Sequence, residues 1–161
     1  MLKADGEVLA TMAASPARRI LGAGMLGSLG VLTLYMAMTA PPSPGWLVFL
    51  LVVGAASIWC GLRLWQATAH TIELTTTELR CTDGTLIARV EDLDHIDRGF
   101  FAFKPSNGFV LRSKRPAARA WYPGLWWRMG RRIGVGGVTP GQQGKTMSEI
   151  LAAMMAGLDP Q

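Results

Sequence analysis

The sequence is poor in the residues that most often carry chemistry. Among 161 residues there are only two histidines, His70 and His95, and two cysteines, Cys60 and Cys81. Their spacing fits neither a zinc site nor a disulfide framework. No combination of serine or cysteine with histidine and a carboxylate can be recognised from spacing as a nucleophilic site. We therefore expect no catalytic residues, no metal and no cofactor.

Charge is missing from two long stretches near the start of the chain. Residues 20–40 form a run of 21 residues without a charged side chain, and residues 46–62 form another of 17. A helix needs about 17–25 such residues to cross a hydrocarbon core about 30 Å thick. Lipid offers no partner to free backbone N–H and C=O groups, so a spanning segment must be helical. The sequence predicts transmembrane helices at 20–40 and 46–65.

Two other interpretations of these stretches are disfavoured. A cleaved signal peptide fits the arginines at 18 and 19, but its apolar region is usually about 7–15 residues long, and here a second run follows at once. A buried helical hairpin in a soluble protein would leave too few residues to cover two helices that are apolar on all sides.

The basic residues flank the apolar stretches on one side. The connection at 41–45, "PPSPG", is uncharged, whereas basic side chains precede the first stretch and end the second: Lys3, Arg18, Arg19 and Arg63. The positive-inside rule then places both termini in the cytoplasm of a bacterium. We expect a multi-pass inner-membrane protein with a cytoplasmic tail at 1–19 and a periplasmic turn at 41–45. Trp46 and Trp65 suit the two interfaces.

Small residues recur at a spacing of four within both stretches. The pairs are Ala23 with Gly27, Gly24 with Ser28, and Ser57 with Gly61. Such faces let helices approach closely in lipid, either within a hairpin or in a homo-oligomer. The stretches contain no Asp, Glu, Lys or His, and this disfavours a transport path.

Beyond the second stretch, residues 68–158 consist of short alternating segments separated by turn residues. Strands are predicted at 70–75, 78–82, 85–90, 95–103, 109–114 and 131–138, with "FFAF" (100–103) packed inside the sheet. Asp83-Gly84 predicts a type I′ hairpin turn with positive φ at both residues, and Asn107-Gly108 predicts another turn. Apolar residues from Ile150 to Leu158 recur at helical spacing, so an amphipathic helix closes the chain.

Strands followed by one helix predict an α+β membrane protein: a transmembrane hairpin, then a small antiparallel sheet or barrel capped by a C-terminal helix. The segment "IELTTTELRCTDGTLIARVEDLDHI" with this element order resembles bacterial pleckstrin-homology-like domains, several of which follow a pair of transmembrane helices. The resemblance covers about residues 68–158 and implies a scaffold or binding module. The insert between "FVLRSK" and "RRIGVGGV" departs from it and leaves the register of the last strands open.

Two other motifs suggest binding sites but are better explained by structure. "GVGGVTPGQQGKT" (134–146) ends like a phosphate-binding loop, but Thr139 stands where the first glycine is needed and Pro140 removes a backbone donor. We expect a strand, a polar turn and a helix starting near Lys145. "EDLDHID" (91–97) fits no calcium or zinc spacing and is expected to be a solvated turn.

The segment "RAWYPGLWWRMGRR" (119–132) combines aromatic rings with arginines in a region from 98 to 148 that has ten Lys and Arg and no Asp or Glu. Three partners suit it: anionic headgroups of the bilayer, a membrane protein, or nucleic acid. Tethering beside the second span favours the bilayer, leaves a protein partner open and disfavours nucleic acid. The remaining alternative is that the tryptophans belong to the core of the domain. The candidate contact residues are Trp121, Tyr122, Trp126, Trp127, Arg128, Arg131 and Arg132.

The sequence thus favours a non-enzymatic inner-membrane scaffold, for example an accessory subunit of a membrane complex. The alternative is a membrane-bound enzyme or transporter component with a site between the domain and the bilayer.

Overall fold

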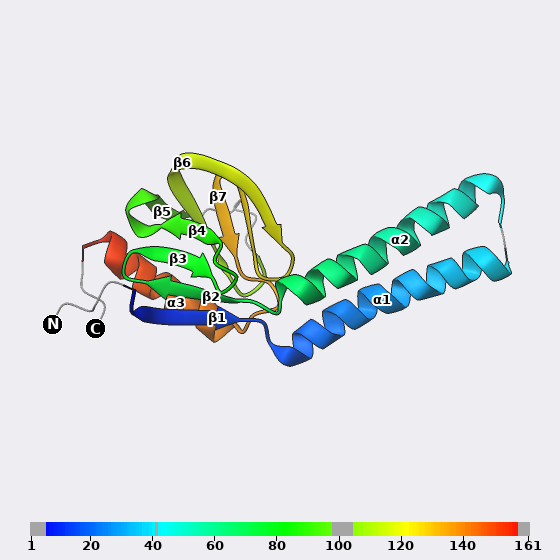
Figure 1. The fold of residues 1–161 in the computed structure, drawn as a ribbon, viewed down its shortest axis with the longest axis horizontal. Helices are drawn as coiled ribbons and strands as arrows, with labels where there is room; N and C mark the ends of the chain where they lie inside the picture. Colours follow the sequence, from blue (N-terminus) through cyan, green and yellow to red (C-terminus); the bar gives the residue numbers. More distant parts are fainter. Residues whose placement is uncertain (1–5, 41, 98–104, 158–161) are drawn as a thin grey trace.

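The computed structural model describes residues 6–40, 42–97 and 105–157. Two long helices, α1 (Pro16–Thr39) and α2 (Pro44–Ala67), project from a β domain (Figure 1). Each helix begins with a proline, whose fixed φ suits a first helical turn. Both are long and apolar enough to cross a membrane, with mean hydropathies of 1.7 and 2.1. Only 11% and 22% of their apolar stretches are buried inside the protein, unlike the core helices of a soluble domain.

Glycines bring the two helices together. A Cβ on Gly30 would lie 2.9 Å from the Gly54 carbonyl oxygen, so the backbones touch at this level. Gly61 faces the backbone of Ala23 and Gly27 at ordinary contact distance. These predicted small residues therefore pack within the hairpin. Gly24 and Ser28 are exposed, and the predicted homo-oligomer would have to use their face.

The amino-terminal segment differs from the expected tail. Val8–Ala13 forms strand β1, which pairs antiparallel with β2 (Thr71–Thr75), the first strand after α2. The backbone N–H of Ser15 also donates to the Val138 carbonyl oxygen at 2.8 Å. The segment before α1 and the segment after α2 therefore belong to one β domain. This domain lies at one end of the helix pair (Figure 1).

The β domain consists of two antiparallel sheets and a helix. One sheet has the order β1-β2-β3-β4, the other β5-β6-β7. The remaining elements are β3 (Glu78–Cys81), β4 (Leu86–Arg89), the 3-10 turn η1 (Val90–Asp92), β5 (Leu93–Asp97), β6 (Phe109–Tyr122), β7 (Trp126–Val135) and α3 (Gly141–Met155). The α+β prediction is confirmed, but the described strands form no closed barrel. The predicted packing of "FFAF" (100–103) falls outside the described residues.

The turn between β3 and β4 is a hairpin turn of a different type from the predicted one. Gly84 has a φ of 90°, but Asp83 does not have a positive φ. The Gly84 N–H donates to the Cys81 carbonyl oxygen, and the Cys81 N–H donates to Thr85. A turn whose last residue alone is left-handed is the usual three-residue hairpin connection. The type I′ prediction was therefore wrong, although the hairpin is present.

The expected insert after "FVLRSK" is regular structure. β6 continues to Tyr122, a short turn follows, and β7 returns from Trp126; we call these two strands and their turn the hairpin arm. Its register shifts on both sides of Ala117, which pairs with Gly130. The arm curls strongly (Figure 1), and the Gly136 N–H donates to the Leu125 carbonyl oxygen at 2.8 Å. The tip of the arm therefore returns to the end of β7.

Candidate functional site

The β domain is fixed to one end of the helix pair, which we call the helix base. Only three residues, 68–70, separate α2 from β2, and the hydroxyl of the first of them, Thr68, donates to the Leu64 carbonyl oxygen. On the other helix, the Arg18 guanidinium donates to the Thr139 carbonyl oxygen at 3.0 Å. Short connections with such contacts leave the domain little freedom to move away from the helices.

The hairpin arm lies along the last turns of α2. At its tip, a Cβ on Gly124, which has a φ of 78°, would meet side chains of Leu64 and Thr68. Further along, the ring of Trp121 lies 6.0 Å from that of Trp59. Trp59 precedes the end of α2 by eight residues, or about 12 Å of helix. The arm therefore reaches back beside the apolar part of α2.

Arginine and tryptophan side chains gather at the helix base. Arg19 lies 3.9 Å over the ring of Trp65 and donates to its carbonyl oxygen at 2.9 Å. Arg63 lies 5.8 Å from the ring of Trp59. Amphipathic rings and arginines with long apolar stems are the side chains that prefer the headgroup layer of a bilayer.

The seven predicted contact residues do not form one surface. Trp126 is 1% exposed and stacks on Tyr122 with centroids 4.8 Å apart, so it belongs to the core. Arg128 on β7 links its strand to β6 and β4, because its guanidinium donates to the carbonyl oxygens of Ala118, Leu86 and Ile87. Trp127 is half-buried over Gly134.

Three predicted residues remain on the surface. Trp121 is 47% exposed, and Arg131 and Arg132 are exposed. Four further residues in this region were not among the seven candidates: Trp59 and Arg63 on α2, and the exposed Arg119 and Met129 on the arm. Trp59 and Arg63 could have been found from the sequence, because they stand four residues apart near the end of a predicted span and therefore lie on one face of the helix.

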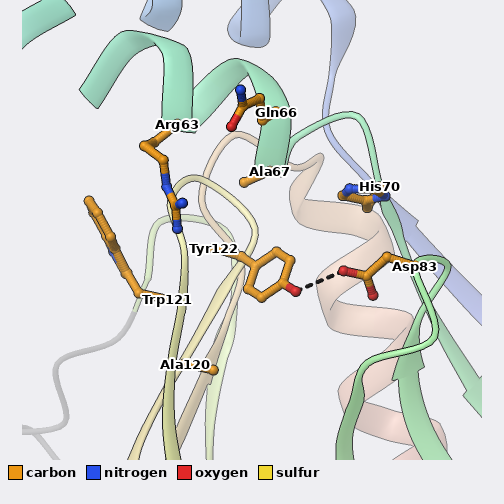
Figure 2. Close-up of a pocket in the computed structure, with 8 residues that line it drawn as sticks. All are labelled: Arg63, Gln66, Ala67, His70, Asp83, Ala120, Trp121 and Tyr122. Atoms are coloured by element: carbon orange, nitrogen blue, oxygen red, sulfur yellow. Dashed lines mark hydrogen bonds between the residues drawn. The ribbon is translucent and has the colours of Figure 1, made fainter. Parts of the chain in front are cut away.

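A cleft of about 300 Å³ lies where the end of α2 meets the arm, and we call it the junction cleft. Figure 2 shows Arg63 reaching from α2 toward Trp121 and Tyr122, with His70 and Asp83 on the opposite side. Gln66, Ala67 and Ala120 complete its lining. Its volume lies at the lower end of the range for small-molecule sites, about 300–1,000 Å³.

Asp83 and Tyr122 form a hydrogen-bonded pair in this cleft. The Tyr122 hydroxyl donates to Asp83 Oδ2 at 2.7 Å, and the Thr85 N–H donates to Asp83 Oδ1 at 2.9 Å. The Thr85 hydroxyl lies 3.0 Å from the Tyr122 oxygen. Because the single Tyr122 proton is directed to Asp83, the Thr85 hydroxyl is left to act as donor to Tyr122.

This network shifts both pKa values in the directions that preserve it. Partial burial raises the pKa of Asp83, but hydrogen bonds from the Thr85 backbone and the Tyr122 hydroxyl outweigh burial and lower that pKa from 3.8 to about 2. For Tyr122, the Thr85 hydrogen bond lowers the pKa, while the Asp83 hydrogen bond and burial raise it more, to above 10.0. Asp83 is therefore ionised and Tyr122 neutral across the physiological range.

We expect replacement of Tyr122 by phenylalanine to destabilise the β domain by about 1 kcal/mol, the usual net value of one hydrogen bond. The Asp83 pKa is lower in the folded chain, so its contribution is present above about pH 4 and is lost as the pH falls toward 2. The Tyr122 pKa is raised, so its contribution is present below pH 10 and is lost at higher pH. The measurement is the melting temperature of wild type and variant against pH. A difference that did not change with pH would contradict this pairing.

The other motifs carry no site among the residues that the structure describes. Lys145 is inside α3, which begins at Gly141, and it lies 4.0 Å from Glu149. Gly141 and Gly144 pack against Asn107, so these glycines serve close packing and do not wrap a phosphate. "EDLDHID" forms η1 and β5, and no cluster of three metal-ligating side chains occurs in the described chain.

In comparisons with known proteins, no protein family, curated protein or solved structure matches the chain.

Proposed function

We propose that this chain is a non-enzymatic integral membrane protein in which α1 and α2 span the bilayer and the β domain lies against its surface. One observation carries the proposal: Trp121 of the hairpin arm packs on Trp59, within the apolar part of α2. If α2 crosses a membrane, this part of the arm must lie at the depth of the headgroups. The domain then serves as a surface-bound scaffold or binding module, as the resemblance to pleckstrin-homology-like domains implies.

Charge and exposure on the arm support contact with anionic lipid. Arg119 and Trp121 are exposed, and Met129 is 61% exposed, although methionine is usually buried. Each basic residue near an anionic surface contributes about 1 kcal/mol. Arg115, Arg119, Arg131 and Arg132 have no ion pair within the described residues, so lipid phosphates would not have to compete with internal carboxylates.

The orientation follows from the same charges. Arg18, Arg19 and Arg63 all lie near the helix base, and the connection at the other end of the helix pair is uncharged. The positive-inside rule then places the β domain and both termini in the cytoplasm of a bacterial cell. A membrane protein that binds the exposed part of the arm is the second candidate partner.

A spin label tests the position of the arm. On a background without Cys60 and Cys81, a label at Met129→Cys in proteoliposomes should be more accessible to oxygen than to a water-soluble relaxation agent. The control label, Ala156→Cys, follows the end of α3 that lies away from the helices (Figure 1) and should show the opposite preference. The chain should also stay in the membrane pellet after alkaline extraction. Equal aqueous exposure of both labels would count against bilayer contact.

A further inference from the structure

The junction cleft presents opposite charges on opposite sides. Arg63 lines one side, and its guanidinium has no carboxylate partner among the described residues; its neighbour is the ring of Trp59. Asp83 lines the other side, with Tyr122 between the two (Figure 2). Arg63 and Asp83 form no ion pair with each other in the described part of the chain. A ligand that suits both must itself carry a positive and a negative group.

Each charged group has unused hydrogen-bonding capacity. A guanidinium has five N–H donors and binds phosphate through two of them. A carboxylate has about four acceptor positions, and Asp83 uses two of them, for Tyr122 and Thr85. The carboxylate is thus held in place by the protein and can still accept hydrogen bonds from an ammonium group.

The place of the cleft identifies the source of such a ligand. Arg63, Gln66 and Ala67 belong to the last turns of α2, and Trp121 beside them packs on Trp59. In the proposed orientation this is the level of lipid headgroups. We propose that the junction cleft binds the headgroup of a zwitterionic phospholipid with a primary amine, with its phosphate on Arg63 and its ammonium on Asp83. This inference rests on the proposed function.

Other headgroups fit the cleft less well. A purely anionic headgroup would place its extra negative surface near the Asp83 carboxylate, which would repel it. A quaternary amine has no N–H to donate, so it would leave the free acceptor positions of Asp83 unfilled. A primary ammonium donates up to three hydrogen bonds. Hydrogen bonds to charged groups are strong enough to give a preference of about tenfold.

Native mass spectrometry of the full chain in detergent tests the proposal. Phosphatidylethanolamine, phosphatidylglycerol and phosphatidylcholine with the same acyl chains would be added in turn, and the bound fraction measured. We expect wild type to bind phosphatidylethanolamine about tenfold more tightly than phosphatidylcholine, whereas phosphatidylglycerol, which the arm also attracts, should lose no binding in Asp83→Asn. Equal binding of the three lipids would overturn the proposal.

Variants assign the two groups. Asp83→Asn should abolish the preference for the primary amine, and Arg63→Gln should weaken binding of phosphatidylethanolamine about tenfold. Lys145→Gln, which removes an exposed basic side chain on α3, outside the cleft and the arm, is the control and should bind like wild type. Arg63 is exposed and makes no hydrogen bond within the described chain, so its replacement should leave the fold intact. Arg63→Gln therefore tests the proposal even if Asp83→Asn does not fold. Unchanged binding by Arg63→Gln would contradict the assignment.

Soluble glycerophosphoethanolamine distinguishes a lipid from a free metabolite. Binding at least tenfold weaker than that of the intact lipid supports a headgroup site at the bilayer, whereas equal binding would assign the cleft to a soluble ligand and overturn the proposal. Failure of the headgroup proposal can be distinguished from failure of the proposed function. A chain that stays in the membrane and contacts lipid through the arm, but shows no headgroup preference, refutes only the inference about the cleft.

Discussion

Replacement of Trp126 by alanine is expected to destabilise the β domain by about 3–5 kcal/mol, the range for removal of a large aromatic side chain from a core. Trp126 is 1% exposed and stacks on Tyr122 at 4.8 Å, within a core that includes Leu111, Leu125 and Ile133. These surroundings cannot collapse onto the space left by an indole. The loss should appear as a lower melting temperature of the tertiary circular dichroism signal in detergent, without release of the protein from membranes.

Trp121→Ala is the matched control, because the two tryptophans lie only five residues apart in the hairpin arm. Trp121 is 47% exposed and touches Trp59 on its packed side. Its removal should lower stability by about 1 kcal/mol, the value of one aromatic pair, while reducing contact between the arm and lipid. If Trp121→Ala destabilised the domain as much as Trp126→Ala does, the division between core and surface residues would be wrong.

The helices and hairpins could be predicted because their causes are local. An uncharged stretch of 21 residues has few alternatives to an apolar helix, and Asp83-Gly84 between two alternating segments predicts a hairpin whatever the rest of the chain does. Even here the turn type was missed, because it depends on the register of the neighbouring strands. Local pattern gives the existence of an element more reliably than its geometry.

Strand β1 could not be predicted in this way. Its partner β2 follows both helices, so the pairing of Met12 with Ile72 spans sixty residues of sequence. The segment "VLATMA" has no regular alternation and is short. Met12 is nevertheless fully buried, because it belongs to a core to which both sheets and α3 contribute. Tertiary contacts create this strand, and the six residues alone do not specify it.

The candidate contact residues could not be sorted by face from the sequence. Which of Trp121, Trp126 and Trp127 points inward depends on the phase of strand alternation, and register shifts near Ala117 change that phase. Pro116 lies within β6 where the register shifts between Arg112 and Ala117, and proline is tolerated at such an irregular position of a sheet. The contact of Trp59 with Trp121, and the cleft that Arg63 lines with the arm, appear only when α2 and β6 are placed side by side.

Gly108→Ala is expected to destabilise the β domain by about 3 kcal/mol or more, at the upper end of the range for overpacking. Gly108 precedes β6 at the point where that strand meets the end of β7. A Cβ there would overlap the carbonyl oxygen of Val135 and lie 2.7 Å from the Cα atom of Gly136. These are backbone atoms, and hydrogen bonds from Gly136 to Leu125 and from Gly137 to Ser106 hold that backbone in place. No rotamer change can relieve the overlap.

Gly130→Ala separates this steric effect from the cost of an unusual φ. Gly130 lies in the same hairpin arm with a φ of 62°, and a Cβ there would meet nothing within 4 Å. Its replacement should cost only about 1 kcal/mol, the value of a left-handed residue with a side chain. Thermal melting of both variants in one detergent gives the comparison. Equal losses of stability in the two variants would mean that the backbones of β6 and β7 can separate at Gly108. Close packing of β6, β7 and α3 would then no longer explain why "GVGGVTPGQQGKT" contains so many glycines.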